Sequence, residues 1–397
     1  MWRLGFFFHE MAFGLLSVFL PLYVISIGGS LVEIGIMTAL ALFLAIPASF
    51  FWGYLCDKTR RYKRYVLISF LSSAVILYLF TWFTNISVLI VLYAIMSVLH
   101  MAHEPPKNVL IAELYSRKDW ERSFAFYEGF TEVGWLIGLV LGFLTAAYGV
   151  VQAYTLLSCS LLNLVAFVLS IVLVTDPLLI FERGLVSIEK SIDFASRGVF
   201  LASKVWNGIS LNGRLKRENV GAFCSGLVLF SLATSILFTP MPVFIDKIVT
   251  ASALPQSIVF AIFVLNSGGA VAGYFIAGRR SNPEAGRANI GRLVIFRSLL
   301  AFLLIWAGMT AYNVVFATII LISMGFAYAV FLAYTLSLSM ELIPTGKAGL
   351  FNVLVGMGSA CGSFIGPFLA QALGFQYVFL TSGLIFFLTY VSFKFFA

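Results

Sequence analysis

Twelve apolar stretches dominate this sequence, and nearly all of them are long enough for an α-helix to cross a lipid bilayer. Such a helix needs about 20 apolar residues, because the hydrocarbon core is about 30 Å thick and a helix rises about 1.5 Å per residue. Charged residues make up only 11% of the chain, whereas soluble domains carry about 25%, so lipid must surround most of the fold. The sequence therefore predicts an all-α membrane protein with twelve transmembrane helices, at about residues 6–27, 32–55, 65–83, 86–114, 123–147, 150–175, 220–245, 255–278, 291–309, 313–341, 349–373 and 376–396.

The 25 Lys and Arg residues divide unevenly between the two sides of the predicted membrane. Twenty-four of them lie on the side that holds both chain ends, and only Lys247, in the loop after the seventh predicted helix, lies on the other. Because positively charged loops remain in the cytoplasm, we expect a multi-pass protein of the cell (plasma) membrane with both termini cytoplasmic. This distribution also accounts for the net charge of +8, so we expect no nucleic acid partner.

One long polar segment, residues 177–219, separates two blocks of six predicted helices, residues 1–176 and 220–397. Between residues 185 and 199 of this connector, apolar side chains recur at helical spacing with charged residues between them. This pattern predicts an amphipathic helix on the cytoplasmic membrane surface.

Matching segments recur in the same order in the two blocks. Pro21 in the first predicted helix corresponds to Pro242 in the seventh. The GxxxGxxxG run that begins at Gly134 recurs at Gly358, at nearly the same offset along the chain. These repeats predict two pseudo-symmetric six-helix halves around a central cavity, which rock against each other to alternate access. We also expect the glycine runs to let neighbouring helices approach closely.

The segment between the second and third predicted helices, GYLCDKTRRYKR from Gly53 to Arg64, resembles the loop signature GxxxD(R/K)xGRR(R/K) of the major facilitator superfamily. With the repeats, this resemblance extends over essentially the whole chain and implies a secondary transporter. In this family the loop forms a cytoplasmic gate, which the resemblance assigns here to Gly53, Asp57, Lys58, Arg61 and Lys63. Asp57 is expected to meet the N-terminus of the helix after Lys347, where a carboxylate is favoured. Arg60 replaces the second glycine of the signature, so we expect no left-handed backbone there.

Ionisable residues inside the predicted helices are concentrated in the N-terminal half. Such residues cost several kcal/mol unless they are paired or hydrated, so each is a functional candidate. Carboxylates removed from water, together with histidines, can exchange protons near neutral pH, and this set therefore favours proton coupling. The candidate proton-coupling residues are Glu104, Glu132, Glu128, Glu10, His100 and His103, with Glu104 and Glu132 as the preferred carriers. The candidate residues of the substrate cavity are His9, Lys107, Asn266, Tyr328, Tyr334 and Asn352.

An alternative interpretation needs no protons. Lys107 would pair with Glu104 or Glu128 as a structural ion pair, and the histidines would be satisfied core groups. In either case, Pro105 and Pro106 are expected to kink the fourth helix and to free backbone carbonyls beside the cluster.

The sequence thus favours a proton-coupled transporter that exports amphipathic or cationic small molecules in exchange for protons. One alternative is proton-coupled uptake of a polar organic solute such as a sugar or a carboxylate. Another is transport of a divalent metal, although Lys107 lies on the same helix face as the possible ligands His100, His103 and Glu104. We expect no enzymatic activity, because no nucleophile and base, paired catalytic aspartates or phosphate loop is visible. We also expect no cofactor and no resident metal, and a monomer whose partners are its substrate, protons and lipid.

Overall fold

The computed structural model describes residues 2–114, 120–176, 220–279, 283–307, 313–342 and 349–396, and these residues form helices joined by short turns. Twelve spans in the described part are long and apolar enough to cross a membrane, as the sequence predicts. In chain order the elements are α1 (Arg3–Ser26), α2 (Leu31–Thr59), α3 (Tyr62–Phe80), α4 (Ile86–His100), the short 3-10 helix η1 (Met101–His103), α5 (Glu104–Leu114), α6 (Trp120–Ala147), α7 (Gln152–Leu173), α9 (Val220–Phe238), α10 (Met241–Ala251), α11 (Ser257–Arg279), α12 (Pro283–Ala307), α13 (Asn313–Leu342), α14 (Gly349–Ala372) and α15 (Phe375–Phe396).

Two of the twelve spans are interrupted helices. The span from Ile86 to Ile111 consists of α4, η1 and most of α5, and the span from Gly221 to Ala251 consists of α9 and α10. Pro240 caps α10 and Pro242 lies in its first turn, so the chain bends there and the helix resumes. Lys247, which we expected in a loop, therefore lies in α10, and that expectation is wrong. The predicted amphipathic helix and Lys347 lie outside the described residues.

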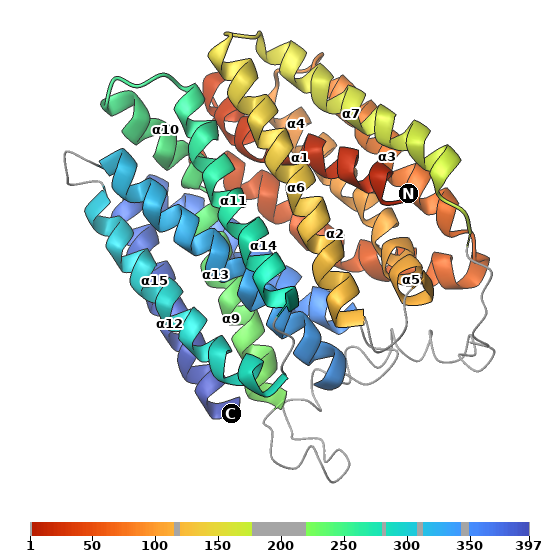
Figure 1. Ribbon diagram of the computed structural model, residues 1–397. Helices are drawn as coiled ribbons and strands as arrows, with labels where there is room; N and C mark the ends of the chain where they lie inside the picture. The colour runs from red at the N-terminus through yellow and green to blue at the C-terminus, as the bar shows by residue number, and fades with distance from the viewer. Residues whose placement is uncertain are drawn as a thin grey trace.

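The helices pack in two groups, coloured from red to yellow and from green to blue in Figure 1. In the first group α1 packs against α6 and α7, and in the second group α9 packs in the same way against α14 and α15. The groups meet where α6 packs against α11 and where α2 packs against α14. Side chains carried by α6 and α11 therefore lie at the boundary between the two groups.

The glycine runs hold both groups together in the expected way. A Cβ atom added to Gly138 of α6 would collide with the carbonyl oxygen of Met11 in α1. A Cβ atom on Gly362 of α14 would likewise collide with the carbonyl oxygen of Leu232 in α9. Met11 and Leu232 are separated by the same offset along the chain as Pro21 and Pro242. The sequence repeat is thus also a repeat of helix contacts, in which glycine lets two backbones touch.

The backbone at Arg60 differs from our expectation. Arg60 caps the C-terminus of α2 in the left-handed conformation, with φ 54° and ψ 25°. Its amide donates a hydrogen bond of 2.8 Å to the carbonyl oxygen of Cys56, which closes the last turn of the helix. A left-handed residue commonly ends a helix in this way, and the closed turn outweighs a steric cost of about 1–2 kcal/mol.

The close contact between α6 and α1 predicts that alanine destabilises the protein at Gly138, whereas alanine at a glycine with free space around it does not. Gly138→Ala lowers the free energy of unfolding by about 1–3 kcal/mol, because its Cβ has no room beside Met11. Gly268→Ala is the control: the nearest atom to its Cβ lies 3.8 Å away, and alanine favours the helix by up to about 1 kcal/mol. The free energy of unfolding of each purified variant in detergent, compared with the wild type, measures the two effects. Equal effects of the two substitutions would contradict the close contact.

Candidate functional site

The N-terminal half contains a polar cluster built around the break between α4 and α5. Pro105 and Pro106 lie in the first turn of α5 and have no amide hydrogen to donate to the preceding turn. The amide of Glu104 bonds instead to the carbonyl of Met101, as in a 3-10 helix. The helical partner that this amide would otherwise have, the carbonyl of His100, accepts a hydrogen bond of 2.9 Å from the hydroxyl of Ser69 in α3. The prolines thus break the helix and free a carbonyl, as the sequence predicts.

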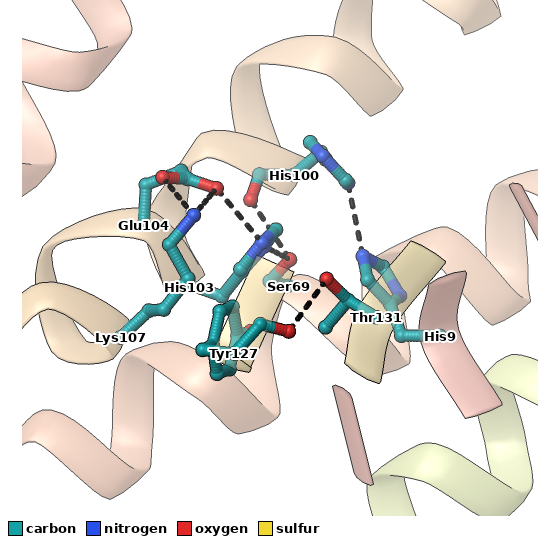
Figure 2. Close-up of polar contacts among 8 residues, drawn as sticks. All are labelled: His9, Ser69, His100, His103, Glu104, Lys107, Tyr127 and Thr131. Atoms are coloured by element: carbon teal, nitrogen blue, oxygen red, sulfur yellow. Dashed lines mark hydrogen bonds and ion pairs between the residues drawn. The ribbon is translucent and has the colours of Figure 1, made fainter. Parts of the chain in front are cut away.

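The break brings all three histidines of the chain together (Figure 2). His9 of α1 is fully buried, and its Nε2 lies 3.1 Å from Nδ1 of His100. Its Nδ1 lies 2.6 Å from Oδ1 of Asn163 in α7. His103 is 1% exposed, and its Nδ1 lies 3.0 Å from Oγ of Ser69. The rings of His9 and His100 bond directly, and His103 joins them through Ser69 and the backbone carbonyl of His100.

Glu104 and Lys107 form an ion pair on the first turn of α5. The ammonium nitrogen of Lys107 lies 2.7 Å from each carboxylate oxygen of Glu104, and Oε1 of Glu104 lies 3.4 Å from Nε2 of His103. The side chain of Lys107 is 13% exposed and that of Glu104 is 23% exposed. The structure therefore contains the ion pair that the alternative interpretation expected with Glu104, and it joins this pair to the histidines.

The remaining predicted carboxylates lie on α1 and α6. Glu10, Glu128 and Glu132 are each partly buried, and none of them forms an ion pair with a described residue. Oε1 of Glu132 accepts a hydrogen bond of 2.7 Å from the hydroxyl of Ser267 in α11. Because α6 and α11 belong to different groups of helices, this bond joins the two halves. Ser267 was not among the predicted site residues, since a serine inside an apolar helix carries no distinguishing signal.

The predicted cavity residues of the C-terminal half whose side chains are described, Asn266, Tyr328 and Tyr334, do not form a comparable cluster. The side-chain amide of Asn266 donates a hydrogen bond of 2.6 Å to the carbonyl of Leu321 and so joins α11 to α13. Tyr334 packs at the edge of the apolar core, and Tyr328 stacks near Phe230 with ring centroids 6.3 Å apart. Asn352 belongs to α14, but its side chain lies outside the described part of the structure.

The predicted gate residues lie around the end of α2. Asp57, Lys58 and Arg61 are exposed, and Gly53 faces open space. The backbone amide of Lys63 donates a hydrogen bond of 2.8 Å to Oδ1 of Asp176, just beyond α7. This contact ties the loop to its own half. The expected meeting of Asp57 with the helix after Lys347 involves residues outside those described, so it stays a prediction.

Arg297 of α12 is a buried cation that the sequence reasoning did not include in the site. Its side chain is fully buried, and none of its three guanidinium nitrogens has a hydrogen-bond partner among the described residues. Four aromatic rings surround it, with centroids 4.9 to 5.8 Å from the guanidinium carbon: Phe230, Phe238, Tyr328 and Phe386. A charged residue within the apolar stretch 291–309 was the available signal.

Comparison with known proteins decides the family. The chain matches the family model of the Major Facilitator Superfamily over residues 4–353. It belongs to this superfamily. The chain is therefore a multi-pass membrane transporter of small molecules and not an enzyme. No match is found among curated proteins.

The solved structures that share the fold over nearly the full length of this chain include two transporters. One is a mutant form of the nucleoside transporter NupG, with a TM-score of 0.74 and 14% identity, covering 99% of this chain and 98% of that chain. The other is the human organic anion transporter MFSD10 (TETRAN), with a TM-score of 0.69 and 16% identity, covering 99% of this chain and 97% of that chain. At this level of identity the similarity establishes the fold alone.

The ion pair at the helix break predicts a non-additive response to substitution. Lys107→Met leaves the carboxylate of Glu104 in a largely buried position without its cation, and lowers the free energy of unfolding by about 3–5 kcal/mol. The double variant Glu104→Gln/Lys107→Met removes both charges, and its loss is smaller than that of Lys107→Met alone. The measurement is the free energy of unfolding in detergent of the wild type, both single variants and the double variant, which together form a double-mutant cycle. Additive losses would show that the two charges do not interact.

Proposed function

We propose that this transporter is proton-coupled and exports amphipathic, cationic small molecules in exchange for protons. The observation that carries the proposal is the hydrogen bond of 2.7 Å from Ser267 to Glu132 across the boundary between the halves. When the halves rock, this carboxylate loses or regains a partner, so its affinity for a proton differs between the two states. A carboxylate whose proton affinity alternates in this way couples proton movement to the change in which side of the membrane the cavity faces.

The surroundings of the carboxylates favour Glu132 over Glu104 as the proton carrier. Both oxygens of Glu104 contact the ammonium of Lys107, which holds that carboxylate in its charged form. Glu132 has only a neutral hydroxyl as its described partner, so protonation does not break an ion pair. This comparison supports a structural role for Glu104 and a coupling role for Glu132.

The excess of carboxylates supports a cationic substrate. Glu10, Glu128 and Glu132 form no ion pair among the described residues, whereas Lys107 is paired with Glu104. A cation bound beside these groups and a proton bound to one of them would compete for the same negative charge. Such competition produces exchange rather than cotransport, which supports export driven by protons.

The proposal also covers the membrane in which the protein lies, its orientation there and its oligomeric state. The excess of Lys and Arg on one predicted side supports a cell membrane location with both termini in the cytoplasm. We expect the protein to work as a monomer, as the pseudo-symmetric halves already provide both sides of the transport pathway.

The coupling role of Glu132 is tested in everted membrane vesicles with an imposed pH gradient. Addition of tetraphenylphosphonium, a lipophilic cation, dissipates the gradient in vesicles with the wild-type protein. Glu132→Gln keeps an acceptor for Ser267 but cannot carry a proton, so it reduces the response to that of vesicles without the protein. Ser267→Ala slows the response, whereas Ser323→Ala is the matched control, because its hydroxyl bonds only to Ile319 of the same helix. A full response in Glu132→Gln would exclude this carrier.

Arg297 supports a second candidate function, proton-coupled uptake of an organic carboxylate. A buried guanidinium without hydrogen-bonded oxygen atoms loses the solvation that water would give it, and aromatic faces compensate only in part. A carboxylate is the planar partner that accepts two parallel hydrogen bonds from arginine. MFSD10, one of the solved structures with this fold, is an organic anion transporter, but the argument here depends on Arg297 alone.

This second candidate predicts that small carboxylates stabilise the purified wild-type protein. At about 100 times the dissociation constant, the gain is about 2.7 kcal/mol in the free energy of unfolding. Arg297→Met loses this response, and Arg297→Lys, which keeps the charge without the planar fork, retains only part of it. Thermal unfolding with a series of mono- and dicarboxylates provides the measurement. If no carboxylate stabilises the wild type while Arg297→Met is itself more stable, the guanidinium has no anionic partner.

A further inference from the structure

The ring nitrogens of the three histidines lie closer together than their hydrogen bonds require. One ring nitrogen from each of His9, His100 and His103 lies within 4.8 Å of the corresponding nitrogens of the other two. The ring centroids lie 4.6 to 5.0 Å apart, although the residues come from α1, the end of α4 and η1. Three nitrogen donors therefore converge on one small region.

These separations suit a transition-metal ion. Metal–nitrogen bonds of about 2.0–2.1 Å at tetrahedral angles place two ligand nitrogens about 3.3 Å apart. Nε2 of His9 and Nδ1 of His100 are already 3.1 Å apart. The widest pair in the cluster lies within 4.8 Å, so a ring shift of about 1.5 Å closes the site around an ion of this size.

The hydrogen bonds around His9 determine which nitrogen can bind. The side-chain NH2 of Asn163 donates to the carbonyl of Cys159 at 2.9 Å, so its oxygen faces His9. His9 must then carry its proton on Nδ1, which leaves the lone pair of a neutral ring on Nε2, beside His100. A histidine whose second nitrogen donates to an amide or carboxylate oxygen is the usual arrangement for a metal ligand.

The same reasoning applies to His103. Ser69 has one hydroxyl proton, which it donates to the carbonyl of His100. Ser69 therefore accepts its other hydrogen bond from Nδ1 of His103, and a neutral His103 ring keeps its lone pair on Nε2. That nitrogen lies 3.4 Å from Oε1 of Glu104, and its lone pair would repel the carboxylate unless a proton or a metal ion lies between them. Lys107 pairs with the same carboxylate, so the ammonium and a bound ion would share the charge of Glu104.

We propose that His9, His100 and His103 bind one divalent transition-metal ion of the zinc, cobalt, nickel or copper class. Imidazole nitrogen is a preferred ligand for these ions, and three protein ligands leave a fourth position for water or another ligand. Binding moves the proton of His100 from Nδ1 to Nε2, so that Nδ1 becomes a ligand without net loss of a proton. The ion cross-links α1 to the α4–α5 break inside the N-terminal half. This site is independent of proton coupling at Glu132.

The test uses the full-length protein in detergent, purified with an affinity tag that contains no histidine. Equilibrium binding of CoCl2 gives one ion per chain. Pulsed electron paramagnetic resonance with Cu²⁺ detects imidazole nitrogen coupled to the ion. Because the chain contains only three histidines, this signal comes from the cluster alone. Absence of binding to the wild type, or binding without an imidazole signal, overturns the proposal and leaves a hydrogen-bonded cluster only.

Two variants distinguish the residues that bind the ion from the residue that orients a ligand. His100→Gln removes a ligand and abolishes stoichiometric Co²⁺ binding. Asn163→Ala leaves all three ligands but frees the orientation of His9, so it weakens Co²⁺ binding by about 10- to 100-fold. Ser160→Ala is the matched control on the same helix, because its hydroxyl bonds to Ala74 and touches no histidine. Equal affinity of Asn163→Ala and Ser160→Ala contradicts the proposed ligand geometry.

Discussion

Inside a membrane, a polar side chain that has left water must find its partners within the protein, and this constraint organises the N-terminal half. Lipid offers no hydrogen bonds, so each unsatisfied buried group costs several kcal/mol. His9 is the clearest case, because it is fully buried and both of its ring nitrogens contact polar side chains. Those contacts come from helices α4 and α7, so satisfying one imidazole fixes how three helices of this half pack together.

The C-terminal half has the same contacts with different chemistry. Phe230 follows His9 by the same offset that relates Pro242 to Pro21 in the first helices of the two halves. His9 contacts Phe70 of α3, His100 of α4 and Asn163 of α7. Phe230 contacts Arg297 of α12, Tyr328 of α13 and Phe386 of α15. The helices that carry these neighbours follow the same order in the two halves. The N-terminal polar groups bond to one another, whereas the guanidinium of Arg297 has no hydrogen-bond partner among the described residues.

Local patterns in the sequence were sufficient for the number of spans and for the close packing at the glycine runs. They did not give the end of the seventh span, because Lys247 continues the helix. They were also sufficient for the break at Pro105 and Pro106, since a missing amide hydrogen is a property of the residue itself. Local patterns were insufficient to predict which side chains each buried polar residue contacts. His9 and Asn163 are far apart in the sequence, and nothing near either residue indicates their contact. Arg60 shows the same limit, because the closed turn that holds its left-handed backbone outweighs the preference of the isolated residue.

The helix break also explains why the ion pair and the histidines occur together. Glu104 is the first residue of α5, where the helix dipole favours a carboxylate, and Lys107 follows one turn later. The same break leaves the carbonyl of His100 free for Ser69, and that hydroxyl then accepts a bond from His103. A single pair of prolines therefore begins the helix that carries the charges and orients the rings beside them. It follows that any movement of η1 during transport changes the ion pair and the histidine cluster together, since both depend on the same three-residue turn.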